Sequence, residues 1–415
     1  MLRFGIGTGS RFREAAKAAA IVAFLTPNIM QRYTLSMMAR KVKDILLFHE
    51  APLWIAWLTV LVFFIFHLNI KIFGNPSQPV LFTLCFSWLL ILVIWNSFEI
   101  AHHVEMLAES VREPLGTLLL TLSVSSIEII TIVNLLILGK NPTLVRDTIY
   151  SIIMIVLNGI VGLSLLVGSI RYREQRYNLR GSLEFVSVIL ILAVMALVLP
   201  DFTKATPERT FSTGQTLFLI CNSIIIYSVF LIMQTLSHTK HFVCPFDAHE
   251  PCKPLKIHLR YTPRRAIYHG VLLLAYLTPT LVIAKQIALP IDVLMASFQL
   301  PPGFGGLLVA ILVLTPEGVS AIRASLSNHL QRSVNIALGS VLTTTALTIP
   351  VVLSFSLFKS QNIVLGLNKN NMTLLLLSLV VSIVTFLSGR TSLLQGILHL
   401  LLFSTYVMLI FDIPF

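Results

Sequence analysis

The chain has 415 residues, of which 56% are hydrophobic and 12% are charged, and its mean hydropathy is +0.86. Soluble domains carry about 25% charged residues, so this composition excludes a soluble globular protein. A net charge of +12 would suggest a nucleic-acid partner in a soluble protein. We instead assign the basic residues to cytoplasmic loops, which are rich in Lys and Arg in membrane proteins, and expect no nucleic-acid partner.

The apolar residues occur in blocks of about 20, the length that crosses about 30 Å of hydrocarbon as an α-helix. The short alternating segments of an outer-membrane β-barrel are absent from the sequence. We therefore expect an all-α polytopic membrane protein with about 11 transmembrane helices. The predicted spans are 52–73, 79–101, 115–138, 146–169, 184–200, 214–236, 266–287, 304–326, 333–358, 371–388 and 392–411.

Basic residues alternate between the predicted loops. The tail at 1–50, in which residues 15–30 are expected to form an interfacial helix, is basic, and so are the loops at 171–180 and 237–265. The loops between these carry few basic residues. Because cytoplasmic loops hold the excess of Lys and Arg, we expect a cytoplasmic N-terminus and a C-terminus outside.

The longest polar segment, 237–265, lies between the sixth and seventh predicted spans. With residues 51–75 set aside as an extra transmembrane helix, this cytoplasmic linker separates five spans at 79–236 from five at 266–415. Since five is odd, two homologous halves of five spans face opposite ways in the membrane. Such inverted repeats are typical of secondary transporters, which bind their substrate at the repeat interface near mid-membrane.

Each predicted half carries one glutamate within an apolar span. Glu128 lies in LTLSVSSIEIITIVNLLIL, residues 120–138, and Glu317 lies in the corresponding span of the second half. A charge at this depth costs about 2.5–3.5 kcal/mol by insertion scales, which makes it a functional-site hypothesis. A shift of 189 residues places Glu128 on Glu317 and Ser151 on Ser340 without a gap. The pair therefore favours a binding site over a purely structural hydrogen bond.

The residues beside both glutamates offer oxygen ligands. Three serines precede Glu128, at 123, 125 and 126, and Thr315 and Pro316 precede Glu317. Proline in a helix removes a backbone hydrogen bond and so frees a carbonyl. Carboxylates, hydroxyls and carbonyls suit a hard cation such as Ca²⁺, which takes 6–8 oxygen ligands. They also suit Na⁺, and they suit a thiophilic metal poorly.

Two stretches resemble a known family. EPLGTLLLTLSVSSIEIITIV and TPEGVSAIRASLSNHLQRSVNIALGSVLTTTALTIP are similar to the two alpha-repeat motifs of the cation/Ca²⁺ exchanger superfamily. With REQRYNLRG after the fourth span, they are most similar to the ChaA-type bacterial calcium (or sodium, potassium)/proton antiporters, and the resemblance covers most of residues 95–360. It implies a transporter of the bacterial cytoplasmic membrane that works by alternating access.

The resemblance also implies the roles of individual residues. Glu128 and Glu317 would bind the cation in one half-cycle and protons in the other, because the two compete for the same oxygens. Ser151 and Ser340 match the family's Gly-Ser positions and are expected to be hydroxyl ligands or helix-packing residues. The weaker ligand candidates are Ser126, Thr315, Thr344 and Asn158.

The transported cation follows less directly from the resemblance. Relatives have Asn before the first glutamate and Asn-Ala-Ala at the second site, where this chain has Ser125 and Ser126, and Thr315-Pro316. Calcium/proton exchange is the leading expectation, and Na⁺/H⁺ or K⁺/H⁺ exchange is the alternative. An intramembrane hydrolase would need a nucleophile motif that the sequence lacks, and channels usually assemble from several subunits. We expect no enzyme activity, no cofactor and no obligatory protein partner; the lipid bilayer, the transported cation and protons are the expected partners.

Two other polar stretches have open interpretations. Glu105, Glu109 and Glu113 follow His102 on one helical face and form either an acidic funnel that concentrates cations or a solvated helix end. The linker 237–265 contains Cys244 and Cys252 with several histidines. Their spacing is not a standard zinc pattern, so the linker is interpreted as a cytoplasmic connection, with a metal sensor as the alternative.

Overall fold

The computed structural model describes residues 50–66, 79–108, 125–126, 128–130, 132–133, 136, 143–204, 206, 210–243, 263–359 and 363–411. The chain divides into two units, Met1–Ile55 and Ala56–Phe415. The helices discussed below belong to the second unit. The expected N-terminal tail up to residue 49, with its interfacial helix, and the linker residues 244–262 lie outside the described part of the chain.

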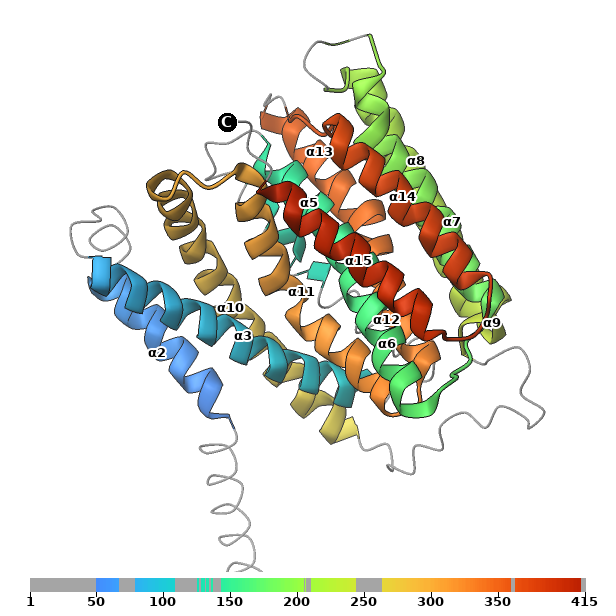
Figure 1. The fold of residues 1–415 in the computed structure, drawn as a ribbon. Coiled ribbons are helices and arrows are strands. Elements are labelled where there is room, and N and C mark those ends of the chain that lie inside the picture. The colour runs from blue at the N-terminus through green and yellow to red at the C-terminus, as the bar shows by residue number, and fades with distance from the viewer. Residues whose placement is uncertain are drawn as a thin grey trace, which may run out of the picture. The chain divides into compact units, whose positions relative to one another are not determined.

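The described residues fold almost entirely into helices (Figure 1), and one isolated bridge joins Arg176 to Arg390. The elements are α2 (Ala51–Phe66), α3 (Pro79–Ala108), α5 (Leu144–Met154), η2 (Ile155–Ile160), α6 (Val161–Tyr172), α7 (Leu179–Ala193), η3 (Val194–Val198), η4 (Leu199–Asp201), α8 (Thr213–Ile232), η5 (Met233–Ser237), α9 (Thr239–Val243), α10 (Pro263–Ser297), α11 (Pro302–Leu326), α12 (Leu330–Thr343), η6 (Thr344–Thr348), α13 (Ile349–Lys359), α14 (Lys369–Phe386) and α15 (Leu393–Ile410). Here η2, η3, η5 and η6 are π-helical and η4 is a 3₁₀ turn.

The all-α polytopic fold class is confirmed. Among the described residues, nine helices are long and apolar enough to cross a membrane, and the shorter apolar α2 precedes them. The expected span at 115–138 lies largely outside the described residues, so the full number of spans stays a prediction. Helix α10 continues ten residues past the predicted end of its span despite Pro279 and Pro290. Neighbouring helices can satisfy the backbone groups that prolines free in a membrane helix.

Polar capping residues fix where several of these helices begin. The Ser212 side chain accepts from the Gln215 N–H, and the Gln215 side chain accepts from the Ser212 N–H, which is a capping box at the start of α8. The Asn178 side chain accepts from the second and third residues of α7, and Asn368 caps α14 in the same way. These bonds satisfy backbone donors that have no partner inside the helix.

Small residues and buried hydrogen bonds set the helix contacts of the second unit. Helices α3 and α10 lie side by side (Figure 1), joined by a hydrogen bond from Asn96 Nδ2 to Thr280 Oγ1 (3.3 Å). Helix α5 packs on α11 at Gly306, where a Cβ atom would lie 2.7 Å from the backbone carbon of Asp147. Helix α15 crosses α6 at Gly396, where a Cβ would lie 2.8 Å from a backbone nitrogen. Close backbone approach at small residues is typical of membrane helix packing.

The 189-residue spacing between the two glutamates recurs elsewhere in the fold. It separates Ile155 from Thr344, the first residues of the π-helical turns η2 and η6. It also separates Ala108 from Ser297, the last residues of α3 and α10. Equal spacing of helix ends and of π turns supports the expected correspondence between the two halves, which stays a prediction.

Candidate functional site

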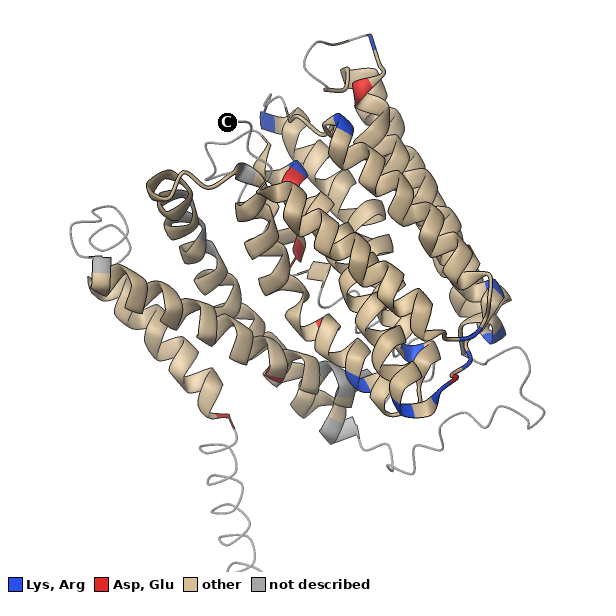
Figure 2. Cartoon of the chain, viewed as in Figure 1, with Lys and Arg blue, Asp and Glu red and all other residues tan. Residues whose placement is uncertain are grey.

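Charged side chains are unevenly distributed over the described helices. Figure 2 shows Lys and Arg at the helix ends and a few acidic residues within the bundle. In the second unit, the acidic side chains that the structure places in the interior are Glu128, Asp147 and Glu317. An ionisable side chain inside a membrane costs free energy, and such residues usually have a function. These three residues are therefore the first candidates for a site.

Glu128 lies in the segment of the predicted third span, and the described residues from 125 to 136 are helical. Its side chain is 2% exposed. One carboxylate oxygen accepts a hydrogen bond from Thr344 Oγ1 (3.0 Å) and the other accepts from Thr348 Oγ1 (2.9 Å). Each oxygen therefore has a hydroxyl partner on η6, and a hydroxyl that donates to a carboxylate stabilises its ionised form.

Glu317 lies near the middle of α11 and is 3% exposed. Its carboxylate accepts a hydrogen bond from the Ser340 hydroxyl of α12. The next residue, Gly318, packs against η2, because a Cβ atom there would lie 3.1 Å from Ile160 Cδ1. Glu317 therefore binds α12, and the residue after it packs against the first π turn.

The continuous helix α12–η6 connects the two glutamates. Ser340 donates to Glu317, whereas Thr344 and Thr348, one and two turns further along, donate to Glu128. The hydroxyls of Ser340 and Thr344 are four residues apart, so the carboxylates that they bind are offset by about 6 Å along this helix. Three hydroxyls on one face of a helix thus bring two carboxylates from distant parts of the sequence into one site.

The two π turns contribute to the site unequally. With the 189-residue spacing, Thr344 and Thr348 of η6 correspond to Ile155 and Gly159 of η2. The first pair has hydroxyls that bind Glu128, and the second pair has no side-chain polar group. π-Helical turns occur frequently at functional sites. Among the described residues, the hydroxyls that contact the two glutamates come from Ser340, Thr344 and Thr348.

The structure brings together some of the predicted site residues and not others. Ser340 and Thr344 contact the glutamates as expected. Ser126 is exposed, whereas its neighbour Ser125 is buried and shares a hydrogen bond with Thr343 (2.7 Å). Thr315 Oγ1 donates to the backbone of its own helix, at Ile311 O (2.7 Å).

The roles of Ser126 and Thr315 as ligands remain predictions. Thr348 was missed by the sequence interpretation. The signal for it was the spacing of four residues between Thr344 and Thr348 in TTTALT, which places both hydroxyls on one helical face.

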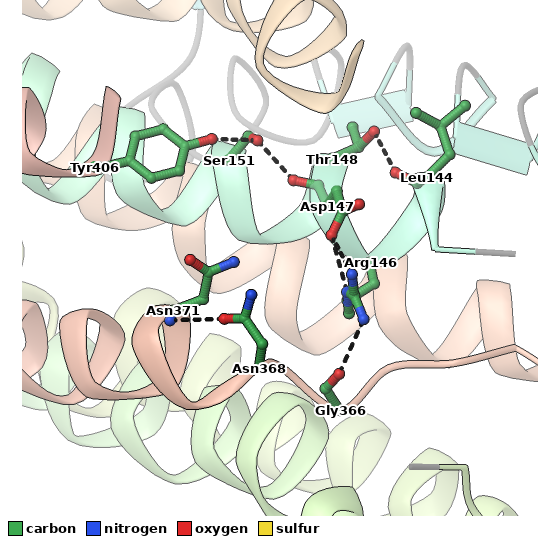
Figure 3. Close-up of polar contacts among 9 residues, drawn as sticks. All are labelled: Leu144, Arg146, Asp147, Thr148, Ser151, Gly366, Asn368, Asn371 and Tyr406. Atoms are coloured by element: carbon green, nitrogen blue, oxygen red, sulfur yellow. Dashed lines mark hydrogen bonds and ion pairs between the residues drawn. The ribbon is translucent and has the colours of Figure 1, made fainter. Parts of the chain in front are cut away.

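Ser151 contacts a second polar cluster instead of the glutamates. Its Oγ lies 2.6 Å from Asp147 O and 2.5 Å from Tyr406 Oη, and Figure 3 shows the three groups in line. The Asp147 carboxylate is paired with Arg146 (2.7 Å), whose guanidinium also donates to Gly366 O (3.2 Å). Among the described residues, an ion pair thus neutralises Asp147, whereas Glu128 and Glu317 have none.

The weaker ligand candidate Asn158 also faces away from the glutamates. Its Nδ2 donates to Ser378 Oγ (2.9 Å), and its Oδ1 lies 3.3 Å from His399 Nδ1. Ser378 belongs to α14 and His399 belongs to α15. Asn158 therefore ties η2 to these two helices.

The remaining polar stretches have partial descriptions. His102 is exposed, and His103 Nδ1 lies 3.0 Å from His269 Nδ1 between α3 and α10. The structure does not describe the side chain of Glu105. Glu109, Glu113 and both linker cysteines lie outside the described residues. In the described part of the chain, no group of three or more His, Cys, Asp or Glu side chains is arranged to hold a metal ion. The two glutamates and their hydroxyls therefore form the candidate cation site.

Comparison with known proteins identifies the family of the chain. Residues 81–236 and 269–411 match the family described as sodium/calcium exchanger protein. The chain is 36% identical to the sodium-potassium/proton antiporter ChaA of Escherichia coli, over 85% of this chain and 96% of that protein. It is 34% identical to the putative ionic transporter y4hA of Sinorhizobium fredii, over 87% of this chain and 96% of that protein.

A solved structure shares the fold. The Ca²⁺/H⁺ antiporter YfkE superposes with a TM-score of 0.63 at 17% identity, covering 86% of this chain and 100% of that chain. At this identity the likeness concerns the arrangement of helices. Together with the family match over most of the sequence, these findings show that the chain is an integral membrane protein of the sodium/calcium exchanger family.

Proposed function

We propose that this protein is a proton-coupled cation antiporter in which Glu128 and Glu317 bind the cation and the protons in turn. The observation that carries the proposal is the single helix face of Ser340, Thr344 and Thr348, whose hydroxyls meet both buried carboxylates. Inverted repeats with a site at their interface operate by alternating access, so this site would open to each side of the membrane in turn.

The charge of the site accounts for coupling. Two ionised carboxylates that share a desolvated site repel each other, and the membrane adds the cost of burying charge. Two protons neutralise the site, and so does one divalent cation, or one monovalent cation with one proton. The empty site with two ionised carboxylates has the highest free energy. The site therefore rarely changes its orientation while empty, and release of one substrate is followed by binding of the other.

Calcium is the substrate we propose first, because two carboxylates and three hydroxyls supply many of the 6–8 oxygens that Ca²⁺ takes. The 36% identical relative ChaA is described as a sodium-potassium/proton antiporter, which supports Na⁺/H⁺ or K⁺/H⁺ exchange as a second candidate. All three cations compete with protons for the same oxygens. Acidification would therefore raise the apparent KM for the transported cation.

We further propose the bacterial cytoplasmic membrane as the location, with the N-terminus in the cytoplasm and the C-terminus outside. Exposed basic residues lie at the end of α6, with Arg171 in its last turn and Arg173 just after it, and Arg390 follows α14. This end of the bundle would face the cytoplasm by the excess of Lys and Arg in cytoplasmic loops. The domain limits 79–236 and 266–415 for the two halves belong to the same proposal.

Transport by everted membrane vesicles tests the function. In vesicles with a preformed proton gradient, adding Ca²⁺, Na⁺ or K⁺ in turn should dissipate the gradient for the true substrate. The Glu128→Gln and Glu317→Gln variants should each reduce exchange at least about 100-fold, because a carboxylate that binds both substrates is lost. Glu174→Gln is the matched control, since Glu174 is exposed and pairs with Arg390 outside the spans.

Two outcomes would reject the proposed function. One is exchange at the control rate by the double variant Glu128→Gln/Glu317→Gln. The other is a large conductance that is not coupled to protons, which would indicate a channel.

A further inference from the structure

The hydroxyl of Ser151 is hydrogen-bonded away from the two glutamates, whereas the corresponding serine of the second half contacts one of them. Ser340, 189 residues further along, donates its hydroxyl to Glu317. Ser151 instead lies between Asp147 O (2.6 Å) and Tyr406 Oη (2.5 Å), and its side chain is fully buried. The contrast between two corresponding serines calls for a physical reason.

The direction of both hydrogen bonds follows from the number of hydrogens. A serine hydroxyl has one hydrogen, and a backbone carbonyl can only accept. Ser151 therefore donates to Asp147 O, and the Tyr406 hydroxyl donates to Ser151 Oγ. Tyr406 thereby engages one of the two lone pairs of Ser151 Oγ and leaves a single lone pair, in a fixed direction, to offer to a cation.

The rise of the helices places Ser151 at about the depth of Thr344 and Thr348, which bind Glu128. Helix α5 and its continuation run alongside α11, because Gly306 abuts Asp147 and Gly318 abuts Ile160, twelve residues later on α11. Ser151 is therefore displaced from the level of Glu317 toward the start of α11 by about 10 Å, at 1.5 Å per residue. Thr344 and Thr348 are displaced from Ser340 in the same direction by about 6 and 12 Å, because α12 returns after a short turn.

The position of the Tyr406 ring is fixed by its neighbours. It meets Tyr150 edge to face, with 5.4 Å between ring centroids and 86° between planes, and it also contacts Phe403. Tyr406 and Tyr150 are each 2% exposed. Among the described residues, the hydroxyl of Tyr150 has no hydrogen-bond partner. The aromatic packing therefore holds Tyr406 in place independently of its hydroxyl.

We propose that Tyr406 is a specificity-determining residue, whose hydroxyl takes up a lone pair of Ser151 that would otherwise be available to a cation beside Glu128. The inference rests on the proposed function. A hydroxyl left with one lone pair in a fixed direction is a poorer ligand than one that can turn both toward the ion, and this penalises a cation that needs 6–8 oxygens more than one that needs fewer. Tyr406 therefore shifts the preference of the site from Ca²⁺ toward monovalent cations.

The Tyr406→Phe variant tests this role, because it removes the hydroxyl and keeps the ring. In everted vesicles the apparent KM for Ca²⁺ should fall about threefold to tenfold, the range of one hydrogen bond, and the KM for Na⁺ and K⁺ should change less than about twofold. The effect should disappear in a Ser151→Ala background. Tyr150→Phe removes a neighbouring buried tyrosine hydroxyl that binds no described group, and it should behave as the wild type.

Binding to the purified protein separates this inference from the proposed function. A ligand that binds the folded state raises the midpoint of thermal unfolding, so the midpoint can be followed against the concentration of each cation without any transport. A steeper response of Tyr406→Phe to Ca²⁺ supports the inference even if exchange is absent.

Three results would overturn the inference: an unchanged or weaker Ca²⁺ response in Tyr406→Phe, the same gain in the Ser151→Ala background, or the same gain in Tyr150→Phe. An unchanged response together with exchange that depends on the glutamates would reject the role of Tyr406 and leave the antiporter intact.

Discussion

Thr348 donates its hydroxyl to Glu128, whereas the hydroxyl of Thr344 is shared between Glu128 and Ser340 O. A hydrogen bond to a charged group contributes about 1.5–3 kcal/mol. The undivided bond from Thr348 should therefore stabilise the ionised carboxylate more than the bond from Thr344 does. At the scale of single residues, the hydroxyls decide how readily Glu128 gives up a proton for a cation.

The Thr348→Val variant should raise the apparent KM for the transported cation about tenfold, because valine keeps the shape of threonine and loses the donor to Glu128. The measurement is the concentration dependence of proton-gradient dissipation in vesicles. Thr345→Val is the control: Thr345 is equally buried, and its hydroxyl donates to the backbone of its own helix, at Val341 O (2.9 Å). Equal effects of the two substitutions would contradict a specific role for Thr348.

That Glu128 and Glu317 are buried could be predicted from the sequence, and the hydroxyls that contact them could be predicted in part. The amino-acid sequence alone shows an ionisable residue inside an apolar run, and it shows a second one 189 residues later. The partner of Ser151 is not, because Tyr406 lies 255 residues away. Ser125 and Ser126 are adjacent, and the rotation of the helix, which the sequence pattern left undetermined, decided that Ser125 is the buried one.

At the scale of elements, close backbone contacts position the site. Gly306 lets α11 approach the backbone of α5 at Asp147 and Thr148. The same two elements carry Glu317 and Ser151, so this contact sets their relative depth. Gly270 in α10 offers a comparison, since a Cβ atom there would have nothing within 4 Å.

The Gly306→Ala variant should lower the stability of the folded protein by about 1–3 kcal/mol, because the added methyl group would clash with backbone atoms that cannot move aside. Gly270→Ala should be neutral or stabilising by about 0.4–1 kcal/mol, because alanine restricts the unfolded chain. Thermal unfolding of both variants in the same detergent measures the difference. A Gly306→Ala variant at least as stable as Gly270→Ala would show that the contact between α5 and α11 is loose.

The hydropathy of the sequence predicted most of the helices, but it did not predict the π turns. A π turn adds a residue to a helix without interrupting the apolar run, so η2 and η6 leave no gap in the pattern at 146–169 or 333–358. The span predicted at 266–287 agrees with the apolar stretch Ala266–Ala284, and helix α10 continues past it to Ser297. Pro290 does not end the helix, and Met295 beyond it lies against Gly305 of α11.

At the scale of the whole molecule, the distribution of basic residues predicts the orientation in the membrane. Glu174 and Lys204 are exposed and lie at the two ends of the span Leu179–Asp201. With the N-terminus in the cytoplasm, residue 174 lies inside and residue 204 lies outside. The two positions are therefore suitable reporters of sidedness.

In a background without the four native cysteines, a Lys204→Cys variant should react with a membrane-impermeant maleimide in intact cells. A Glu174→Cys variant should react only after the cells are opened. Labelling in everted vesicles should give the opposite pattern. If residue 174 is labelled in intact cells and residue 204 is not, the orientation is reversed.

The two hydroxyls that bind Glu128 belong to the π turn η6 and are four residues apart. Deleting one residue between Thr344 and Thr348 would restore ordinary α-helical winding, in which each residue advances the helix by about 100°. The two threonines would then be three residues apart, and side chains three apart in an α-helix still share a face. The pair should therefore tolerate a change in local winding, so the site depends on the spacing of its threonines more than on the π turn that carries them.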